Sequence, residues 1–140
     1  MSAHGTLLAG VMGWPVAHSL SPLLHGHWIA EHGLNAHYVP LAVEPQNLAQ
    51  ALTALTALGF RGVNLTIPHK EAALATVCQI DAAAALIGAI NTVIIEDGRL
   101  TGRNTDAIGY ANSLREAGVE RIAGHALVLG AGGAARAVVY

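Results

Sequence analysis

The sequence has few charged residues, few aromatic residues and a single cysteine, and these shortages exclude several classes of protein. Charged residues make up 11% of the chain, and a formal charge of −2 provides no basic face for nucleic acid or an anionic membrane. Cys78 stands alone, so neither a disulfide framework nor a thiolate metal cluster can form within the chain. No apolar run reaches the roughly 18 residues that suggest a membrane span. The segment 1–10 lacks the basic start of a secretion signal.

The eight histidines form no pattern of metal ligands. His25 and His27 lie two positions apart in a candidate helix and therefore point to different faces. Four others show no ligand spacing with a carboxylate: His18, His32, His37 and His69. We therefore expect no metal site. Hydrophobic residues, by contrast, make up 53% of the chain, which excludes a disordered chain. Together with the absences above, this composition predicts a soluble, cytoplasmic domain of a small-molecule enzyme.

Strand and helix patterns alternate along the chain and predict an α/β fold, a mostly parallel sheet flanked by helices. Pro40 favours an edge position for its strand, and Asp97-Gly98 is typical of a two-residue hairpin turn. Strands are expected at 7–12, 38–43, 60–66, 90–96, 99–101 and 126–129. Helices are expected at 21–33, 45–59, 68–75, 81–88 and 105–117. One stripe of the second helix should be buried: Leu48, Leu52, Leu55 and Leu58.

Near the end of the chain, Gly130-x-Gly132-x-x-Ala135 follows a short apolar segment and precedes a helix start. This is the context of a dinucleotide fingerprint, in which small residues allow the backbone to approach a pyrophosphate. The alternative is a glycine-rich turn between a strand and a helix.

Two hydroxyl residues, Ser19 and Ser21, precede another helix start. Free backbone N–H groups and the helix dipole favour an anion there, so these hydroxyls could hold a small carboxylate. The alternative is that Ser21 is a plain N-cap and Ser19 a turn residue.

Asn64, Thr66 and Lys70 belong to a strand and the helix that follows it. Alternation puts Asn64 and Thr66 on one face, at the strand tip where ligands usually bind in α/β sheets. Lys70 lies in the first helical turn, where the dipole opposes its charge and favours a pKa lowered toward the range useful for proton transfer. The alternative is a solvated surface lysine.

Two further polar groups need partners. The pair Asn91-Thr92 lies in an apolar strand and must bind backbone or ligand. Asp106 could cap a helix, or it could face Lys70 and share a hydrogen bond with a substrate hydroxyl.

Taken together, these segments resemble shikimate dehydrogenase from Gly13 to Arg136. The resemblance rests on S-x-S-P at 19–22, N-x-T-x-P-x-K at 64–70, G-A-x-N-T at 88–92, G-x-N-T-D-x-x-G at 102–109 and the glycine loop at 130–135. The family catalyses the reversible, NADPH-dependent reduction of 3-dehydroshikimate to shikimate, a step toward chorismate and the aromatic amino acids. Lys70 and Asp106 match the family's catalytic lysine and aspartate.

The resemblance implies a role for each matching residue. Lys70, paired with Asp106, would pass a proton to or from the reacting oxygen while the nicotinamide transfers hydride. The ring carboxylate of shikimate would be held by Ser19 and Ser21, and the ring hydroxyls by Thr66, Asn91 and Asp106. The NADP cofactor would be bound by Gly130, Ala131, Gly132, Gly133 and Ala134.

The resemblance also implies a division into a substrate-binding domain at 1–106, a linking helix and loop at 107–124, and the truncated start of a Rossmann-type NADP domain at 125–140. We expect an incomplete fragment with little or no dehydrogenase activity alone, whose partners are shikimate and 3-dehydroshikimate; no oligomeric state is indicated. Alternatives are a quinate/shikimate dehydrogenase using NAD, a non-catalytic shikimate-binding module, and an unrelated α/β domain. A structure in which Lys70 and Asp106 lie beyond roughly 6 Å of each other, with no cleft between them, would support the last alternative.

Overall fold

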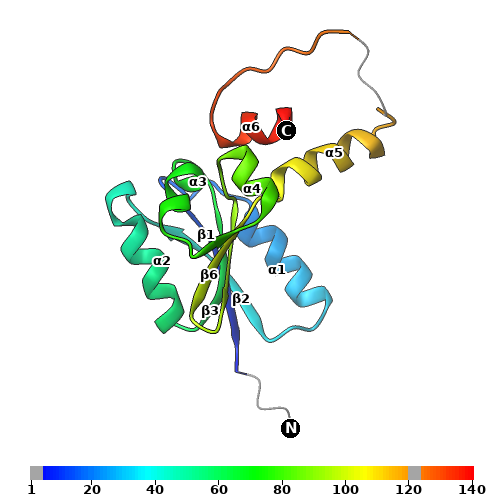
Figure 1. The fold of residues 1–140 in the computed structure, drawn as a ribbon. Helices are drawn as coiled ribbons and strands as arrows, with labels where there is room; N and C mark the ends of the chain where they lie inside the picture. The colour runs from blue at the N-terminus through cyan, green and yellow to red at the C-terminus, as the bar shows by residue number, and fades with distance from the viewer. Residues whose placement is uncertain (1–4, 120–123) are drawn as a thin grey trace.

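The computed structural model describes residues 5–119 and 124–140, and it contains one six-stranded sheet with helices on both faces (Figure 1). The strands are β1 (Leu7–Gly13), β2 (Ala36–Ala42), β3 (Phe60–Leu65), β4 (Gln79–Ile80), β5 (Thr92–Glu96) and β6 (Arg99–Arg103). The helices are α1 (Ser21–Glu31), α2 (Leu48–Ala57), α3 (His69–Ala72), α4 (Ala82–Ile87), α5 (Asp106–Glu116) and α6 (Gly133–Val139). Two 3-10 turns, η1 (Pro45–Asn47) and η2 (Ala73–Ala75), precede α2 and follow α3. The predicted fold class is confirmed.

The strand order across the sheet is β2-β1-β3-β5-β6-β4. Three of the five pairings are parallel, namely β1 with β2, β1 with β3, and β4 with β6. The antiparallel pairings involve β5, which joins β6 through the predicted hairpin. Asp97 and Gly98 form its turn with φ of 49° and 73°, as a type I′ turn requires. Pro40 lies in β2 at the edge of the sheet, where its missing N–H is tolerated.

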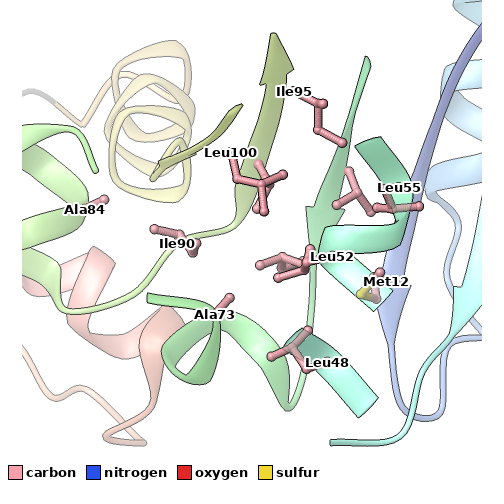
Figure 2. Packing of buried hydrophobic residues seen from close by; sticks show 12 residues of the cluster. Met12, Leu48, Leu52, Leu55, Ala73, Ala84, Ile90, Ile95 and Leu100 are labelled. Atoms are coloured by element: carbon pink, nitrogen blue, oxygen red, sulfur yellow. The ribbon is translucent and has the colours of Figure 1, made fainter. Parts of the chain in front are cut away.

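The main hydrophobic core lies between one face of the sheet and α2, with Ala73 of η2 alongside (Figure 2). Leu48, Leu52 and Leu55 of α2 are buried there as the apolar stripe predicts. The prediction for Leu58 is wrong: α2 ends at Ala57, and Leu58, its C-cap residue, is 62% exposed. Helix α1 covers the opposite face without burying any of its residues.

The alternatives in which Ser21 and Asp106 are the N-cap residues of their helices are not borne out. Leu20, not Ser21, occupies the N-cap of α1, and the hydroxyl of Ser19 accepts a hydrogen bond from the Ser21 N–H at 3.3 Å. At α5 the N-cap is Thr105, whose side chain makes no capping bond, and Asp106 is the first helical residue. Neither Ser21 nor Asp106 is therefore the N-cap residue of its helix, whereas the Ser19 hydroxyl binds a backbone N–H at the start of α1.

The predicted strand at 126–129 does not form. A strand needs a neighbour for its backbone groups, and no strand in the described ranges pairs with this segment. Leu127 and Leu129 accordingly stand 86% and 87% exposed. The glycine-rich loop nevertheless leads into a helix, α6, as predicted. None of the helices in the described ranges has the length and apolarity needed to cross a membrane.

Candidate functional site

A polar cleft of about 290 Å³ opens at the edge of the sheet where β1 and β3 end. The amino end of the antiparallel β5 and the start of α5 meet at the same edge, so residues distant in the sequence gather there. The cleft is lined by Val11, Ser19, Ser21, His25, Asn64, Leu65, Thr66, Lys70, Asn91 and Asp106. Its size is at the lower end for small-molecule sites, and its lining includes hydroxyl, amide and charged groups.

Lys70 and Asp106 meet in this cleft. Lys70 lies on the short helix α3 after β3, and Asp106 opens α5 after β6. The Nζ atom of Lys70 lies 2.6 Å from Oδ2 of Asp106, and the two side chains are only 18% and 30% exposed. Lys70 is therefore not a solvated surface lysine. The short distance and the adjoining cleft are the opposite of the separation that would have supported an unrelated domain.

Asn91 fixes the orientation of the Asp106 carboxylate. It is buried, and its Nδ2 donates to Oδ1 of Asp106 at 2.7 Å. Its Oδ1 accepts the backbone N–H of Thr105 at 2.9 Å and the hydroxyl of Thr92 at 3.0 Å. Both oxygens of Asp106 thus have a donor, one from Asn91 and one from Lys70. An aspartate held in this way can act on a bound hydroxyl without first reorganising.

A chain of side-chain hydrogen bonds links this carboxylate to residues on β5, β3 and β2. Asn64 donates from Nδ2 to the hydroxyl of Thr92 at 3.1 Å, and its Oδ1 accepts from the Tyr38 hydroxyl at 2.7 Å. Burial raises the pKa of Tyr38 to about 12, although the nearby Ser21 hydroxyl acts in the opposite direction. Tyr38 therefore remains a hydrogen-bond donor at neutral pH. The series of donors runs in one direction, from Tyr38 through Asn64, Thr92 and Asn91 to Asp106.

His25 also lines the cleft. Its ring stacks on Tyr38 with centroids 4.0 Å apart and an angle of 8° between the planes, while Trp28 meets it edge-on at 5.3 Å. Partial burial lowers the pKa of His25 below 6.5, so the neutral imidazole is favoured. Sequence reasoning predicted no role for His25 or Tyr38, because their contact depends on α1 crossing the edge strand β2.

The glycine loop forms a second cavity, of about 670 Å³, against α3. Gly130, Gly132, Gly133 and Ala134 are among its lining residues, and Ala131 is not. Lys70 and Thr66 line both this cavity and the polar cleft. The Lys70 side chain therefore belongs to the wall between a candidate substrate site and a candidate cofactor site.

The residues of the loop fit a dinucleotide cradle. Gly130 has φ of 126°, a conformation that side chains rarely permit. A Cβ atom added to Gly133 would lie 2.8 Å from the Cβ of Ala89, so only glycine allows this close approach. Within residues 5–119 and 124–140, no three His, Cys, Asp or Glu side chains are grouped as a metal site.

The fold and the site together define an α/β domain with a small polar cleft at the carboxyl ends of parallel strands, the position where such sheets usually bind ligands. A family model described as the shikimate dehydrogenase substrate binding domain matches residues 11–93. The chain belongs to this family.

Individual relatives agree with that assignment. The shikimate dehydrogenase (NADP(+)) of Rhodospirillum rubrum is 57% identical over 134 residues, which are 94% of this chain and 47% of that protein. The shikimate dehydrogenase (NADP(+)) of Acidiphilium cryptum is 50% identical, over 99% of this chain and 50% of that protein. A crystal structure of shikimate 5-dehydrogenase from Thermus thermophilus in complex with NADP(H) and shikimate superposes with a TM-score of 0.88 at 47% identity, covering 95% of this chain and 50% of that one. The chain thus spans about half the length of the relatives it matches.

Proposed function

We propose that the chain is the substrate-binding part of a cytoplasmic shikimate dehydrogenase, an NADP-dependent oxidoreductase that interconverts 3-dehydroshikimate and shikimate. The observation that carries the proposal is the ion pair of 2.6 Å between Lys70 and Asp106 on the wall of a small polar cleft. Family membership and the names of the relatives support the choice of substrate and of NADP. The division into a substrate domain at 1–106, a linking segment at 107–124 and a nucleotide-binding start at 125–140 is part of the same proposal.

In this proposal, two groups of residues that line the cleft bind different parts of the substrate. Ser19 and Ser21 hold the ring carboxylate with hydroxyl donors, next to the start of α1. Thr66, Asn91 and Asp106, which line the same cleft, bind ring hydroxyls. The ion pair presents the Lys70 ammonium group and the Asp106 carboxylate to the same substrate oxygen.

Lys70 donates a proton to the carbonyl oxygen as that oxygen gains negative charge, and it accepts the proton again in the reverse direction. Asp106 holds the ammonium group in place and accepts a hydrogen bond from the substrate. The cofactor, when bound along Gly130–Ala134, supplies or accepts the hydride. Because Lys70 lines both cavities, its ammonium group would act at the boundary between the substrate site and the candidate cofactor site.

Calorimetry with shikimate tests the carboxylate site on this chain. Ser19→Ala and Ser21→Ala should each weaken binding about 5- to 50-fold, because each removes a hydrogen bond to a charged group. Ser113→Ala is the matched control, since the Ser113 hydroxyl donates to the Tyr110 carbonyl on α5, away from the cleft. The proposal fails if the wild-type chain does not bind shikimate, or if the control weakens binding as much as the two site variants.

Lys70→Ala separates binding from chemistry. If Lys70 transfers a proton rather than anchors the substrate, this variant should retain shikimate binding within about tenfold of wild type. Loss of all binding would instead make Lys70 a substrate-holding residue and would remove the argument for its catalytic role.

A further inference from the structure

An ion pair outside the polar cleft joins the helix that carries Lys70 to the helix that follows the glycine loop. Glu71, the residue after Lys70 on α3, lies 3.0 Å from the guanidinium group of Arg136 on α6 through its Oε2 atom. The two side chains are 45% and 46% exposed. Neither residue lines the polar cleft, so the proposed substrate site does not account for the pair.

The guanidinium group of Arg136 has several neighbours. While one part of its guanidinium group contacts Glu71, its Nε donates to the carbonyl oxygen of Ala131 at 3.2 Å, within the glycine loop. The same guanidinium lies against Gly88, because a Cβ atom added there would be 3.2 Å from its NH1 atom. Arg136 therefore contacts α3, the end of α4 and the glycine loop at the same time.

The glycine loop packs directly on Lys70 at this point. A Cβ atom on Gly133 would be 3.3 Å from the Cβ of Lys70, and one on Gly132 would be 3.8 Å from Oε1 of Glu71. Glu71, Lys70 and the loop together line the cavity of about 670 Å³. Any change in the distance between α3 and the loop would alter both the width of this cavity and the exposure of Lys70.

We propose that Glu71 and Arg136 form a positioning clamp, which holds the glycine loop against α3 and thereby shields the Lys70 amine on the cofactor side. The clamp rests on the proposed function for its purpose, since it would set the spacing between the proton donor and the bound dinucleotide. Neither residue touches the reacting atoms in this scheme, and both act through the position of the loop.

The chain contains one lysine, so the clamp can be measured directly. The rate at which an amine acylating reagent modifies Lys70 reports its accessibility, and peptide mass spectrometry separates it from the N-terminal amine. Glu71→Gln and Arg136→Gln should each accelerate the modification about 2- to 5-fold, as expected for breaking a partly exposed ion pair.

The direction in which Glu71→Gln and Arg136→Gln change the modification rate of Lys70 distinguishes a clamp from a purely electrostatic effect. On charge alone, removal of the Glu71 carboxylate favours the neutral, reactive amine, and removal of the Arg136 guanidinium disfavours it. A clamp predicts acceleration in both variants. It also predicts that the double variant reacts no faster than the faster single variant, because either change already opens the same contact.

Arg115→Gln is the matched control, since Arg115 pairs with Asn112 on α5 and its loss removes one positive charge elsewhere. The proposal is overturned if the two single variants change the rate in opposite directions, if neither changes it, or if the control accelerates it equally. Amide hydrogen exchange in α6 provides a second measurement, and it should speed up in both single variants.

Adding shikimate separates this proposal from the proposed function. Because Lys70 lines the polar cleft, bound shikimate should slow its modification in the wild-type chain. If shikimate has no effect while the unliganded rates follow the pattern above, the substrate assignment fails and the clamp stands. If shikimate protects Lys70 but the variants behave like wild type, the clamp alone fails.

Discussion

The Nδ2 atom of Asn91 lies 2.7 Å from Oδ1 of Asp106, while the other oxygen of that carboxylate is 2.6 Å from Lys70. An ionised carboxylate can only accept hydrogen bonds, so the amide of Asn91 is forced to present its nitrogen to Asp106 and its oxygen to Thr92 and Thr105. The orientation of the whole polar site therefore depends on this one amide.

Asn91→Ala removes a single amide group but should weaken both the fold and the polar site. The variant leaves the Thr105 N–H without its acceptor and removes one donor from Asp106. We expect a loss of about 2 kcal/mol in the free energy of unfolding, measured by urea denaturation, and at least tenfold weaker shikimate binding. Asn112→Ala is the control, because Asn112 is exposed and its side chain accepts from the Arg115 guanidinium on α5, away from the cleft. Equal losses in both variants would show that Asn91 does not organise the site.

Gly133→Ala tests the close packing of the glycine loop. The new methyl group would meet the Cβ of Ala89 at 2.8 Å, so α6 must move away and the free energy of unfolding should fall by about 1 to 3 kcal/mol. Gly26→Ala changes a glycine inside α1 where an added Cβ meets nothing within 4 Å, and it should stabilise the chain by about 0.5 to 1 kcal/mol. Urea denaturation of both variants checks these opposite signs, and a tolerated Gly133→Ala would place the loop farther from Ala89.

Asp81→Ala tests the side-chain cap at the start of α4. Asp81 accepts the Ala84 N–H at 2.6 Å, so its loss should cost about 1 kcal/mol. Asn47→Ala is matched to it, because Asn47 holds the N-cap of α2 without a side-chain capping bond and should change little. A similar cost at the two positions, measured by thermal unfolding, would contradict the difference in capping.

Most of the fold followed from local patterns. The leucine stripe of α2, the turn at Asp97-Gly98 and the edge position of Pro40 each have a local physical cause, and each was confirmed apart from Leu58 at the end of the stripe. The errors arose where a distant partner decides the structure. The segment 126–129 has strand composition but no neighbouring strand in the described part of the chain, whereas the two-residue β4 has no recognisable pattern and exists because β6 lies beside it.

In the candidate site, too, the features that depend on contacts between distant residues could not be predicted from local sequence. Local sequence could not bring Lys70 to Asp106 across 36 positions, and the family resemblance supplied that pairing before the geometry did. The contacts of Tyr38 with Asn64 and of Glu71 with Arg136 went unpredicted, since they belong to no motif considered and arise from the packing of whole elements. The capping alternatives for Ser21 and Asp106 were not borne out, because the residue before each of them occupies the N-cap.

The titration of His25 should report on the wall of the polar cleft. Its pKa lies below 6.5 because the folded state partly buries the ring against Tyr38. Tyr38→Ala exposes the ring and should raise that pKa toward 6.5, whereas Tyr38→Phe keeps the stacked ring and should leave it unchanged. A lowered histidine pKa costs stability as pH falls from 6.5 through the folded value, so the acid-side loss should shrink in Tyr38→Ala alone. NMR titration of the His25 ring, assigned with His25→Gln, checks both outcomes. An unchanged pKa of His25 in Tyr38→Ala would mean that α1 itself, rather than the tyrosine, desolvates the imidazole.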